Sequence, residues 1–331
     1  MRIVATAPVR TADVGGWTDT WFASHGSVCS IAIDPGVTVT LETTAGPAGE
    51  VRLCVPSAGV DLIIDALGDS GADPLLVSAI RTRPLPEAVR ITVGSGVPAG
   101  SGLGTSASVT VAILAAIDAA AGCFRDAHAL ACAAHRVETG LGLQSGIQDQ
   151  LAAAFGGINR YDVHYPYGGT IHRVGSDDLM RALDDRMVTV YLGRPHSSSA
   201  LHDLVIASLE GVDNAAMLEP LRDAAHRAAA ALQRFDLHAY GIALTDATEG
   251  MRRLHPELIC ENADRIIEVA REHGALGWKV NGAGGNGGSV AILGPADLSR
   301  HMDLVGVIDR APDIEVLRTR VARTGVRVVV G

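Results

Sequence analysis

Lysine is almost missing from this sequence, since Lys279 is the only one among 27 Lys and Arg residues. The 37 acidic residues leave a net charge of −10 and an isoelectric point near 5.6. A protein that binds nucleic acid neutralises many phosphates with basic patches, and this balance argues against such a surface. The charge balance does not exclude binding of a single nucleotide, because one or two basic side chains and backbone N–H donors suffice to hold its phosphates.

Cysteine pairs and long apolar runs are also missing. The five cysteines are scattered and never spaced as C-x-x-C, so they indicate free thiols in a reducing compartment rather than disulfides or a zinc site. The N-terminus lacks the apolar stretch of a signal peptide, and no apolar run reaches membrane-spanning length. We therefore expect a cytoplasmic protein with no membrane partner.

Several catalytic signatures are absent as well. A Walker P-loop needs Gly-Lys-Ser/Thr, but the only lysine follows Trp278. Neither G-x-S-x-G nor H-E-x-x-H occurs, which excludes the serine-hydrolase elbow and the corresponding zinc protease. Residues 282–287 match G-x-G-x-x-G. A strand rather than a helix is predicted after them, so a dinucleotide-binding unit is not indicated.

The order of predicted elements indicates an α+β protein with two domains, residues 1–185 and 186–331. Apolar residues make up 47% of the 331 positions, enough for a large core. Strands are predicted at 37–43, 88–93, 157–163, 187–192, 276–280, 289–293 and 326–330. Helices are predicted at 105–121, 125–139, 145–154, 198–210, 214–234, 236–252, 256–273 and 295–309. The closing strand is assigned to the second domain.

The most informative segment is VPAGSGLGTSAS, residues 97–108. It combines small and hydroxyl residues, and an alanine-rich helix is predicted directly after it. A glycine-rich turn that leads into a helix points several backbone N–H groups at one spot, and the helix dipole adds partial positive charge there. Glycines let a phosphate approach the backbone without a side chain in the way. The alternative is an ordinary tight turn, which the density of small and hydroxyl residues disfavours.

Three separated segments together resemble the GHMP kinase superfamily. They are residues 7–20 (APVRTADVGGWTDT), 99–108 and 279–293 (KVNGAGGNGGSVAIL). The second matches P-x-x-x-G-L-G-[ST]-S-A, and the third matches K-x-x-G-A-G-G-x-G-G with Asn286 in place of the usual glycine. The sequence GGWTDT is most similar to the L-fucokinase and heptose-7-phosphate kinase branch. The resemblance implies a ribosomal-S5-like N-terminal domain and a ferredoxin-like C-terminal domain, with ATP between them.

The resemblance also implies a nucleotide and metal site. The residues expected to hold the ATP phosphates are Pro98, Gly100, Ser101, Gly102, Leu103, Gly104, Thr105 and Ser106. Phosphoryl transfer needs Mg²⁺ with hard oxygen ligands, and Ser106 and Glu138 match the metal positions of the family. Asp149 matches the catalytic aspartate, and Arg10 is the cation that would keep it ionised. Taken singly, such residues are more often solvated charges, helix caps or surface ion pairs.

The acceptor is expected at Trp17, Thr18 and Asp19, together with Gly282, Gly284 and Gly285 of the third segment. An aspartate accepts hydrogen bonds from sugar hydroxyls and an indole packs on a pyranose ring, although a tryptophan is more often simply core. Residues 196–199 (HSSS) are expected to cap a helix, with substrate binding as the alternative. Arg194, Arg252 and Arg253 are candidates for holding a phosphate already present on the acceptor.

These features predict an ATP- and Mg²⁺-dependent kinase that phosphorylates a sugar hydroxyl, with the anomeric one favoured. The acceptor is expected to be a hexose, a deoxyhexose or a heptose phosphate, bound by a monomer or homodimer with no nucleic-acid partner. One alternative is a GHMP kinase for a non-sugar alcohol such as an inositol, an amino acid or an isoprenoid. Another is a non-catalytic sugar or nucleotide sensor, against which the presence of Ser106, Glu138 and Asp149 weighs.

Overall fold

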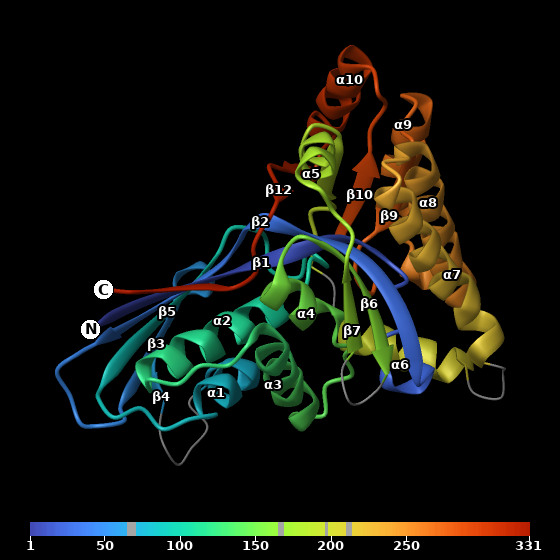
Figure 1. Cartoon of the computed structure of the whole chain (residues 1–331). Coiled ribbons are helices and arrows are strands. Elements are labelled where there is room, and N and C mark those ends of the chain that lie inside the picture. The colour runs from blue at the N-terminus through green and yellow to red at the C-terminus, as the bar shows by residue number, and fades with distance from the viewer. Residues whose placement is uncertain (65–70, 165–168, 196–197, 210–213) are drawn as a thin grey trace.

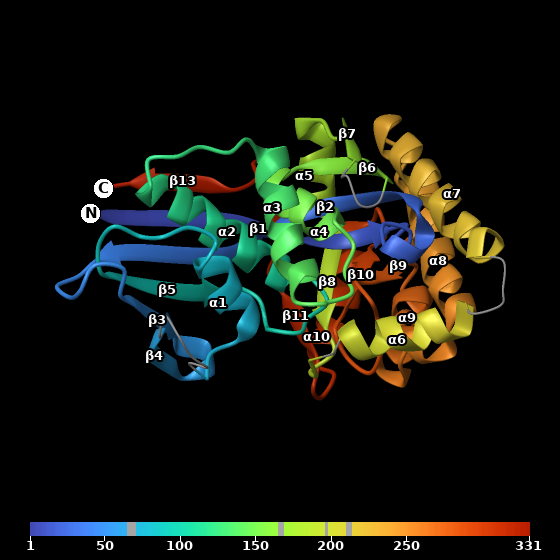
Figure 2. The ribbon, with the colours of Figure 1, turned by 90° about the horizontal axis from the view of Figure 1, so that it is seen from below.

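A computed structural model describes residues 1–64, 71–164, 169–195, 198–209 and 214–331, apart from the side chains of 198–200 and 214–215. Within these ranges the chain forms two sheets with helices packed against them, as Figures 1 and 2 show. This arrangement confirms the predicted α+β class. The described helices include none that is both long enough and apolar enough to cross a bilayer.

The first sheet has nine strands in the described part of the chain. They are β1 (Arg2–Val14), β2 (His25–Thr43), β3 (Val51–Val55), β4 (Val60–Ile64), β5 (Val89–Ser95), β6 (Ile158–His164), β7 (Gly169–Arg173), β12 (Arg320–Val321) and β13 (Arg327–Val330). The main order is β13-β1-β2-β5-β3-β4. Strand β2 is 19 residues long, so its first half pairs with β6 and its second half with β5.

One face of this sheet is covered by four helices (Figure 1). They are α1 (Pro74–Ile80), α2 (Thr105–Ala120), α3 (Ala127–Gly140) and α4 (Gln148–Phe155). Helix α2 contacts β1, β2, α3 and α4. Its alanine-rich sequence is apolar on all sides, which is typical of a helix buried between a sheet and other helices. The first turn of α2, where an anion site is predicted, is therefore held rigidly.

The second sheet is antiparallel, with the order β11-β8-β10-β9. Its strands are β8 (Met187–Tyr191), β9 (Gly277–Val280), β10 (Ser289–Leu293) and β11 (Glu315–Leu317). The helices of this half are α5 (Asp177–Asp184), α6 (Ser198–Leu209), α7 (Asn214–Gln233), α8 (Leu237–Leu254), α9 (Glu261–Glu272) and α10 (Leu298–Asp309). This strand order agrees with the predicted ferredoxin-like arrangement.

The structure corrects two details of the sequence prediction. The closing strand β13 pairs with β1, with Ile3 opposite Val330, and so belongs to the first sheet rather than the second domain. A short valine-rich strand has the same local pattern whichever sheet it joins, so the sequence does not specify its partner. The predicted helix 256–273 is a 3₁₀ turn, η3 (Pro256–Leu258), followed by α9, because Ile259 and Cys260 between them are extended. The domain division at residue 185 stays a prediction.

The first and last residues of the chain lie side by side (Figure 1). The backbone N–H of Arg2 donates to the carbonyl oxygen of Gly331 at 3.1 Å, and the N–H of Gly331 donates to the carbonyl oxygen of Arg2 at 2.8 Å. The hydrogen bonds between the two segments therefore continue beyond β13 to Gly331.

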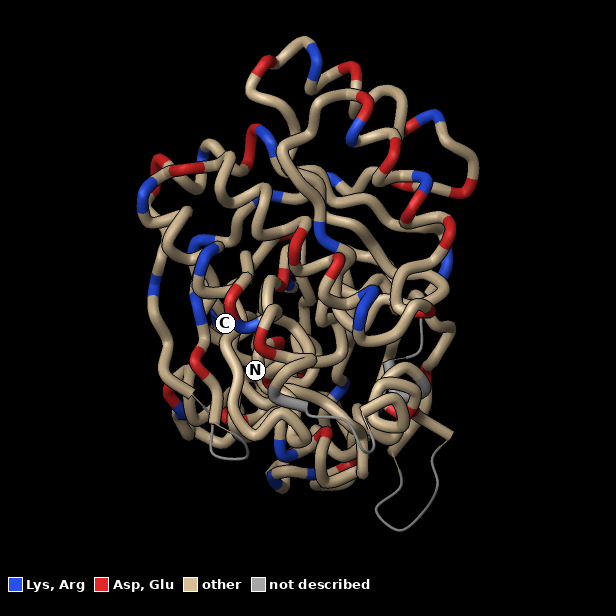
Figure 3. The backbone as a smooth tube through the Cα atoms, turned by 90° about the vertical axis from the view of Figure 1, so that its right-hand side faces the viewer, with Lys and Arg blue, Asp and Glu red and all other residues tan. Residues whose placement is uncertain are grey.

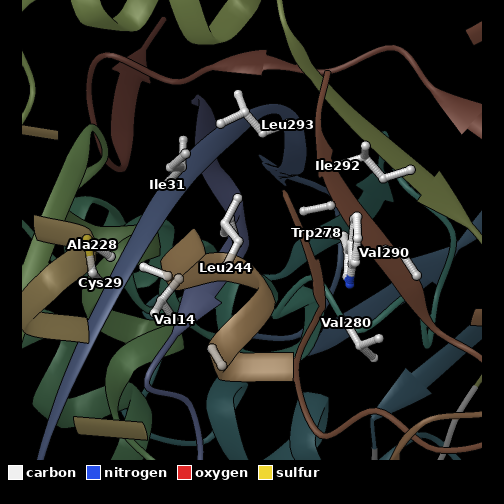
Figure 4. Close-up of a cluster of buried hydrophobic side chains, with 14 of the residues drawn as sticks. Val14, Cys29, Ile31, Ala228, Leu244, Trp278, Val280, Val290, Ile292 and Leu293 are labelled. Carbon is white, nitrogen blue, oxygen red and sulfur yellow. The ribbon is translucent and has the colours of Figure 1, made fainter. Parts of the chain in front are cut away.

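The apolar core continues across the two halves. Figure 4 shows Val14 and Ile31 of the first sheet near Leu244 of α8, in one buried cluster that also includes Val280 and Val290 of the second sheet. Burial of side chains from both halves in one core opposes separation of the two sheets, since it would expose this apolar surface. The boundary between the halves is thus a stable place for a binding site.

Truncation of a side chain in this shared core should destabilise the whole chain. Leu244 is fully buried, so Leu244→Ala is expected to lower the free energy of unfolding by about 2–5 kcal/mol, measured by urea unfolding. The matched control is Leu298→Ala on α10, where the side chain is 65% exposed and a change within about 0.5 kcal/mol is expected. Equal effects of the two substitutions would contradict the shared core.

Candidate active site

A cavity of about 300 Å³ lies where the two halves of the chain meet. Its walls come from β1 and the segment after it, the glycine turn and the start of α2, the end of α3 and the start of α4 with the loop between them, helix α6 and the loop after β9. The predicted site residues that line it are Arg10, Trp17, Asp19, Gly100, Ser101, Gly102, Gly104, Thr105, Ser106, Glu138, Asp149 and Gly282. Three sequence segments that are far apart therefore meet at one place.

The glycine turn has the geometry of an anion cradle. Gly100, Gly102 and Gly104 have positive φ angles of 68°, 73° and 72°, a conformation that favours glycine. Gly104 is the N-cap of α2 and no side chain caps the helix, so its first N–H groups are available to a ligand. The buried hydroxyl groups of Ser101 and Thr105 have no hydrogen-bond partner among the described residues. The turn therefore fits a ligand rich in acceptor oxygens, as the phosphates of ATP are.

Beside this turn, Arg10 and Asp149 form a two-point ion pair. The Nε of Arg10 donates to Oδ1 of Asp149 at 2.7 Å, and its Nη2 donates to Oδ2 at 3.2 Å. The Nη1 of Arg10 donates to the carbonyl oxygen of Gly102, which fixes the pair against the turn. Burial opposes the charge on Arg10, but the carboxylates of Asp13 and Asp149 outweigh it and raise the pKa of the guanidinium. A buried guanidinium thus holds the Asp149 carboxylate next to the cradle.

Glu138 is a second carboxylate at the cavity, presented by α3. Its Oε2 accepts hydrogen bonds from Ser145 Oγ at 2.9 Å and from Gln150 Nε2 at 2.7 Å. Burial raises its pKa to about 7, and hydrogen bonds from Ser145, Gln150 and Ser106 offset this only in part. A buried carboxylate whose charge is this poorly compensated is suited to a cation.

The cavity wall carries more negative than positive charge. Its acidic residues are Asp13, Asp19, Glu138 and Asp149, and its basic side chain from Lys or Arg is Arg10. Over the rest of the backbone the two signs are interspersed in the view of Figure 3. The described residues include no cluster of three or more His, Cys, Asp or Glu side chains that could hold a metal by itself. A Mg²⁺ ion here would therefore draw part of its coordination from phosphate oxygens and water, as Mg²⁺ commonly does.

A buried cluster connects the third sequence segment to β1. The backbone N–H of Gly282 donates to both carboxylate oxygens of Asp13, at 3.1 and 3.2 Å. The Nζ of Lys279 lies 3.6 Å from Asp13 Oδ1, and the side chain is fully buried. Burial lowers the pKa of Lys279, and the neighbouring charge of Asp13 offsets part of this fall. Asn281 Oδ1 accepts from the backbone N–H of Ala12 at 2.8 Å. The glycine loop after β9 is thereby held against the strand that carries Arg10.

Trp17 and Asp19 also line the cavity. Oδ2 of Asp19 accepts from the backbone N–H of Gln148 at 3.0 Å. Burial raises the pKa of Asp19 from its ordinary 3.8 to about 7, and the nearby charge of Asp149 adds to the rise, while the Gln148 bond lowers it in part. A side chain at position 146 would collide with Asp19, because a Cβ on Gly146 would lie 1.9 Å from Oδ2.

Five predicted residues do not line the cavity. They are Thr18, Pro98, Leu103, Gly284 and Gly285. The hydroxyl of Thr18 donates to the carbonyl oxygen of Gly15 at 2.8 Å, and Leu103 is buried while its carbonyl oxygen accepts from the Arg10 N–H at 2.9 Å. The N–H of Gly285 donates to Leu258 at 2.9 Å. These contacts shape the loops around the cavity, and nothing in the geometry supports a direct ligand contact for the five.

The residues considered for a second phosphate also lie elsewhere. Arg252 pairs with Asp264 and Glu249, and Arg253 donates to the Glu249 carbonyl oxygen. Arg194 lines a separate, more open hollow beside α6, as does Asn286, so the substitution at 286 does not alter the main cavity. The predicted cap at 196–199 falls on residues 196–197 and on side chains of 198–199 that lie outside the described part of the chain.

Sequence reasoning missed Asp13, Ser145, Gln148 and His202, which all line the cavity. Asp13 stands inside residues 7–20, three positions from Arg10, and Gln148 directly precedes Asp149. Their spacing alone could have raised them as candidates. His202 lies on α6 with no motif around it, so only the fold brings it to the site.

Comparisons with known proteins agree with this geometry. The family model described as GHMP kinases N terminal domain matches residues 74–157. The model described as GHMP kinases C terminal matches residues 228–300. Galactokinase from Mycobacterium tuberculosis is 32% identical over 256 residues, which cover 67% of this chain and 68% of that protein. The chain belongs to the GHMP kinase family. Members of this family use ATP as the phosphate donor, and the chain is a phosphotransferase of the sugar-kinase branch.

More distant GHMP kinases cover nearly the whole chain. The bifunctional fucokinase/GDP-fucose pyrophosphorylase of Arabidopsis thaliana is 24% identical over 326 residues, which cover 91% of this chain and 31% of that protein. A D-glycero-D-manno-heptose 1-phosphate kinase from Bacteriodes thetaiotaomicron has a TM-score of 0.77 at 21% identity, covering 99% of both chains. Lactococcus lactis galactokinase complexed with galactose has a TM-score of 0.75 at 17% identity, covering 98% of this chain and 95% of that one. These structures share the fold.

The raised pKa of Asp19 makes a stability prediction. Between its ordinary pKa of 3.8 and its folded value of about 7, only the unfolded chain releases the proton, so this group lowers the free energy of unfolding as pH rises. Asp19→Asn removes that contribution. Relative to the parent protein, the variant should gain on the order of 4 kcal/mol between pH 4 and pH 7.5 in metal-free urea unfolding. Asp178→Asn, at a side chain that is 80% exposed, is the matched control, and parallel pH profiles for all three proteins would refute the assignment.

Proposed function

We propose that this GHMP kinase transfers the γ-phosphoryl group of ATP to a hydroxyl of a sugar. The observation that supports this most directly is the Arg10–Asp149 pair at the edge of the glycine turn, 2.7 Å between Nε and Oδ1. It puts a carboxylate that can accept a proton beside the cradle that fits the phosphates. The named relatives, galactokinase and fucokinase, support a sugar as the acceptor.

In the proposed reaction the acceptor oxygen attacks the γ-phosphorus atom. A new O–P bond forms, the bond from the γ-phosphorus to the bridging oxygen breaks, and ADP leaves with that electron pair. The hydroxyl proton passes to a carboxylate oxygen of Asp149. Arg10 orients that carboxylate through two N–H donors, one to each of its oxygens. The backbone N–H groups at the start of α2 would hold the phosphate oxygens.

Ser106 and Glu138 are the residues that would hold Mg²⁺, which supplies charge neutralisation on the phosphates when bound. Both line the cavity, and the buried Glu138 carboxylate gains from a neighbouring cation. Among sugar hydroxyls we favour the anomeric one. It is the most acidic hydroxyl of a free sugar, so a carboxylate that is a weak base deprotonates it most readily.

The role of Asp149 can be tested by substitution. Asp149→Asn keeps the shape but removes the proton acceptor, so turnover should fall by about 10²–10⁴-fold while ATP binding persists. ADP release in the presence of a sugar panel measures turnover, and nucleotide titration by calorimetry measures binding. Asp303→Asn on α10, at an exposed position, is the control with turnover unchanged. Full turnover in Asp149→Asn would overturn the assignment.

The metal assignment makes a separate prediction. Ser106→Ala and Glu138→Gln each remove one oxygen ligand or its charge, so each should raise the Mg²⁺ concentration that gives half the maximal rate by about tenfold. Initial rates measured across a Mg²⁺ titration at saturating ATP test this. Titration curves that superimpose on that of the parent protein would remove these residues from the metal site.

A further inference from the structure

Trp17 is held in a strained conformation at the cavity. Its φ angle is 78°, in the left-handed region that bulky residues rarely adopt. Its carbonyl oxygen accepts a hydrogen bond from Thr20 Oγ1 at 2.8 Å, and this bond holds the backbone between the two residues. Such conformations persist where the surroundings impose them, and they cluster at ligand sites. The indole Nε1 is buried and has no hydrogen-bond partner among the described residues, so one N–H donor is left for a ligand.

The side chain of His202, from the other half of the chain, lies against Trp17. It lies on α6, is 8% exposed, and its ring centroid is 4.8 Å from that of Trp17 at an interplanar angle of 48°. Both side chains line the cavity. We name Trp17 and His202 the aromatic corner. An aromatic corner offers an apolar surface of the kind against which the C–H face of a sugar ring packs.

The acidic groups that line the cavity with the aromatic corner accept hydrogen bonds. Asp19 contributes a buried carboxylate, and Asp13 contributes another. A sugar hydroxyl can donate to such an oxygen and accept from the Trp17 N–H at the same time. A phosphate group only accepts, and its charge is repelled by carboxylates, so it needs several donors or cations instead.

Such cations are not at the cavity in the described part of the chain. All Lys and Arg residues belong to the described ranges, and of these only Arg10 lines the cavity. Its guanidinium is already engaged by Asp149 and by the Gly102 carbonyl oxygen. Of the other arginines considered for this role, Arg252 and Arg253 bond to acidic partners or backbone outside it, and Arg194 lines a separate hollow.

Resting on the proposed function, we infer that the acceptor is a free sugar with no phosphate group of its own. Its ring packs against the aromatic corner, and its hydroxyls bond to Asp19 and to the Trp17 N–H. His202 is then a specificity-determining residue that sequence motifs do not mark. The sequence left two acceptor classes open, free sugars and sugar phosphates, and this inference selects the free sugars.

Matched substrate pairs test the inference. The rate of ADP release is measured with galactose against galactose 6-phosphate, mannose against mannose 6-phosphate, and glucose against glucose 6-phosphate. For whichever pair is turned over, kcat/KM for the free sugar should be higher by about a hundredfold or more, because like charges at close range cost several kcal/mol. Equal or greater kcat/KM for the sugar phosphates would overturn this inference and leave the kinase function intact. No turnover of any free sugar or sugar phosphate would overturn both.

Substitutions at the aromatic corner provide a second test. Trp17→Phe keeps an aromatic face but removes the N–H donor, and His202→Ala removes the second ring of the corner. Each should raise KM for the preferred free sugar about five- to tenfold and leave KM for ATP unchanged. His226→Ala, on the exposed side of α7, is the matched control with both constants unchanged. A rise in KM for ATP alone, or no change in KM for the sugar in either variant, would show that the corner does not hold the acceptor.

Discussion

The site depends on the buried guanidinium of Arg10, which is shared between two carboxylates and a backbone carbonyl. A charge taken out of water is unfavourable unless it is closely paired, and Arg10 meets Asp149 at 2.7 Å and Asp13 at 3.9 Å. Asp13 in turn accepts from Gly282 and lies beside Lys279. One cation therefore connects β1, the glycine turn, the start of α4 and the loop after β9. Loss of Asp13 or Asp149 would leave this buried cation with one carboxylate instead of two.

The cavity lies where two sheets that share one core meet, and both halves of the chain contribute to it. The first half contributes the anion cradle and the carboxylates, while the second contributes the glycine loop and His202. Neither half contains the full set of groups. The continuous apolar packing around Leu244 and Val290 maintains their relative positions, so the geometry does not depend on a ligand to bring the halves together.

The sequence was informative where local chemistry demands particular residues. The glycine turn could be predicted, because only glycine readily adopts the positive φ angles at 100, 102 and 104. Glu138 and Asp149 could be proposed only through family resemblance, since a single acidic residue on a helix carries no local signal. His202 could not be predicted at all, because its approach to Trp17 is a property of tertiary packing. Thr18 shows the reverse error, since its hydroxyl bonds to the backbone within its own loop although it lies between two cavity residues.

The pairing of β13 with β1 affects how the chain acquires its structure during synthesis. Residues 3–6 pair with residues 327–330, so the outer edge of β1 cannot be covered until a strand far along the chain has been made. Contacts between such distant positions form slowly, because the closure of a very long loop must precede them. The helices on the first sheet can assemble earlier, but one edge of β1 stays unpaired until β13 has been made. An open strand edge is a route to misassembly between nascent chains, and β13 closes it.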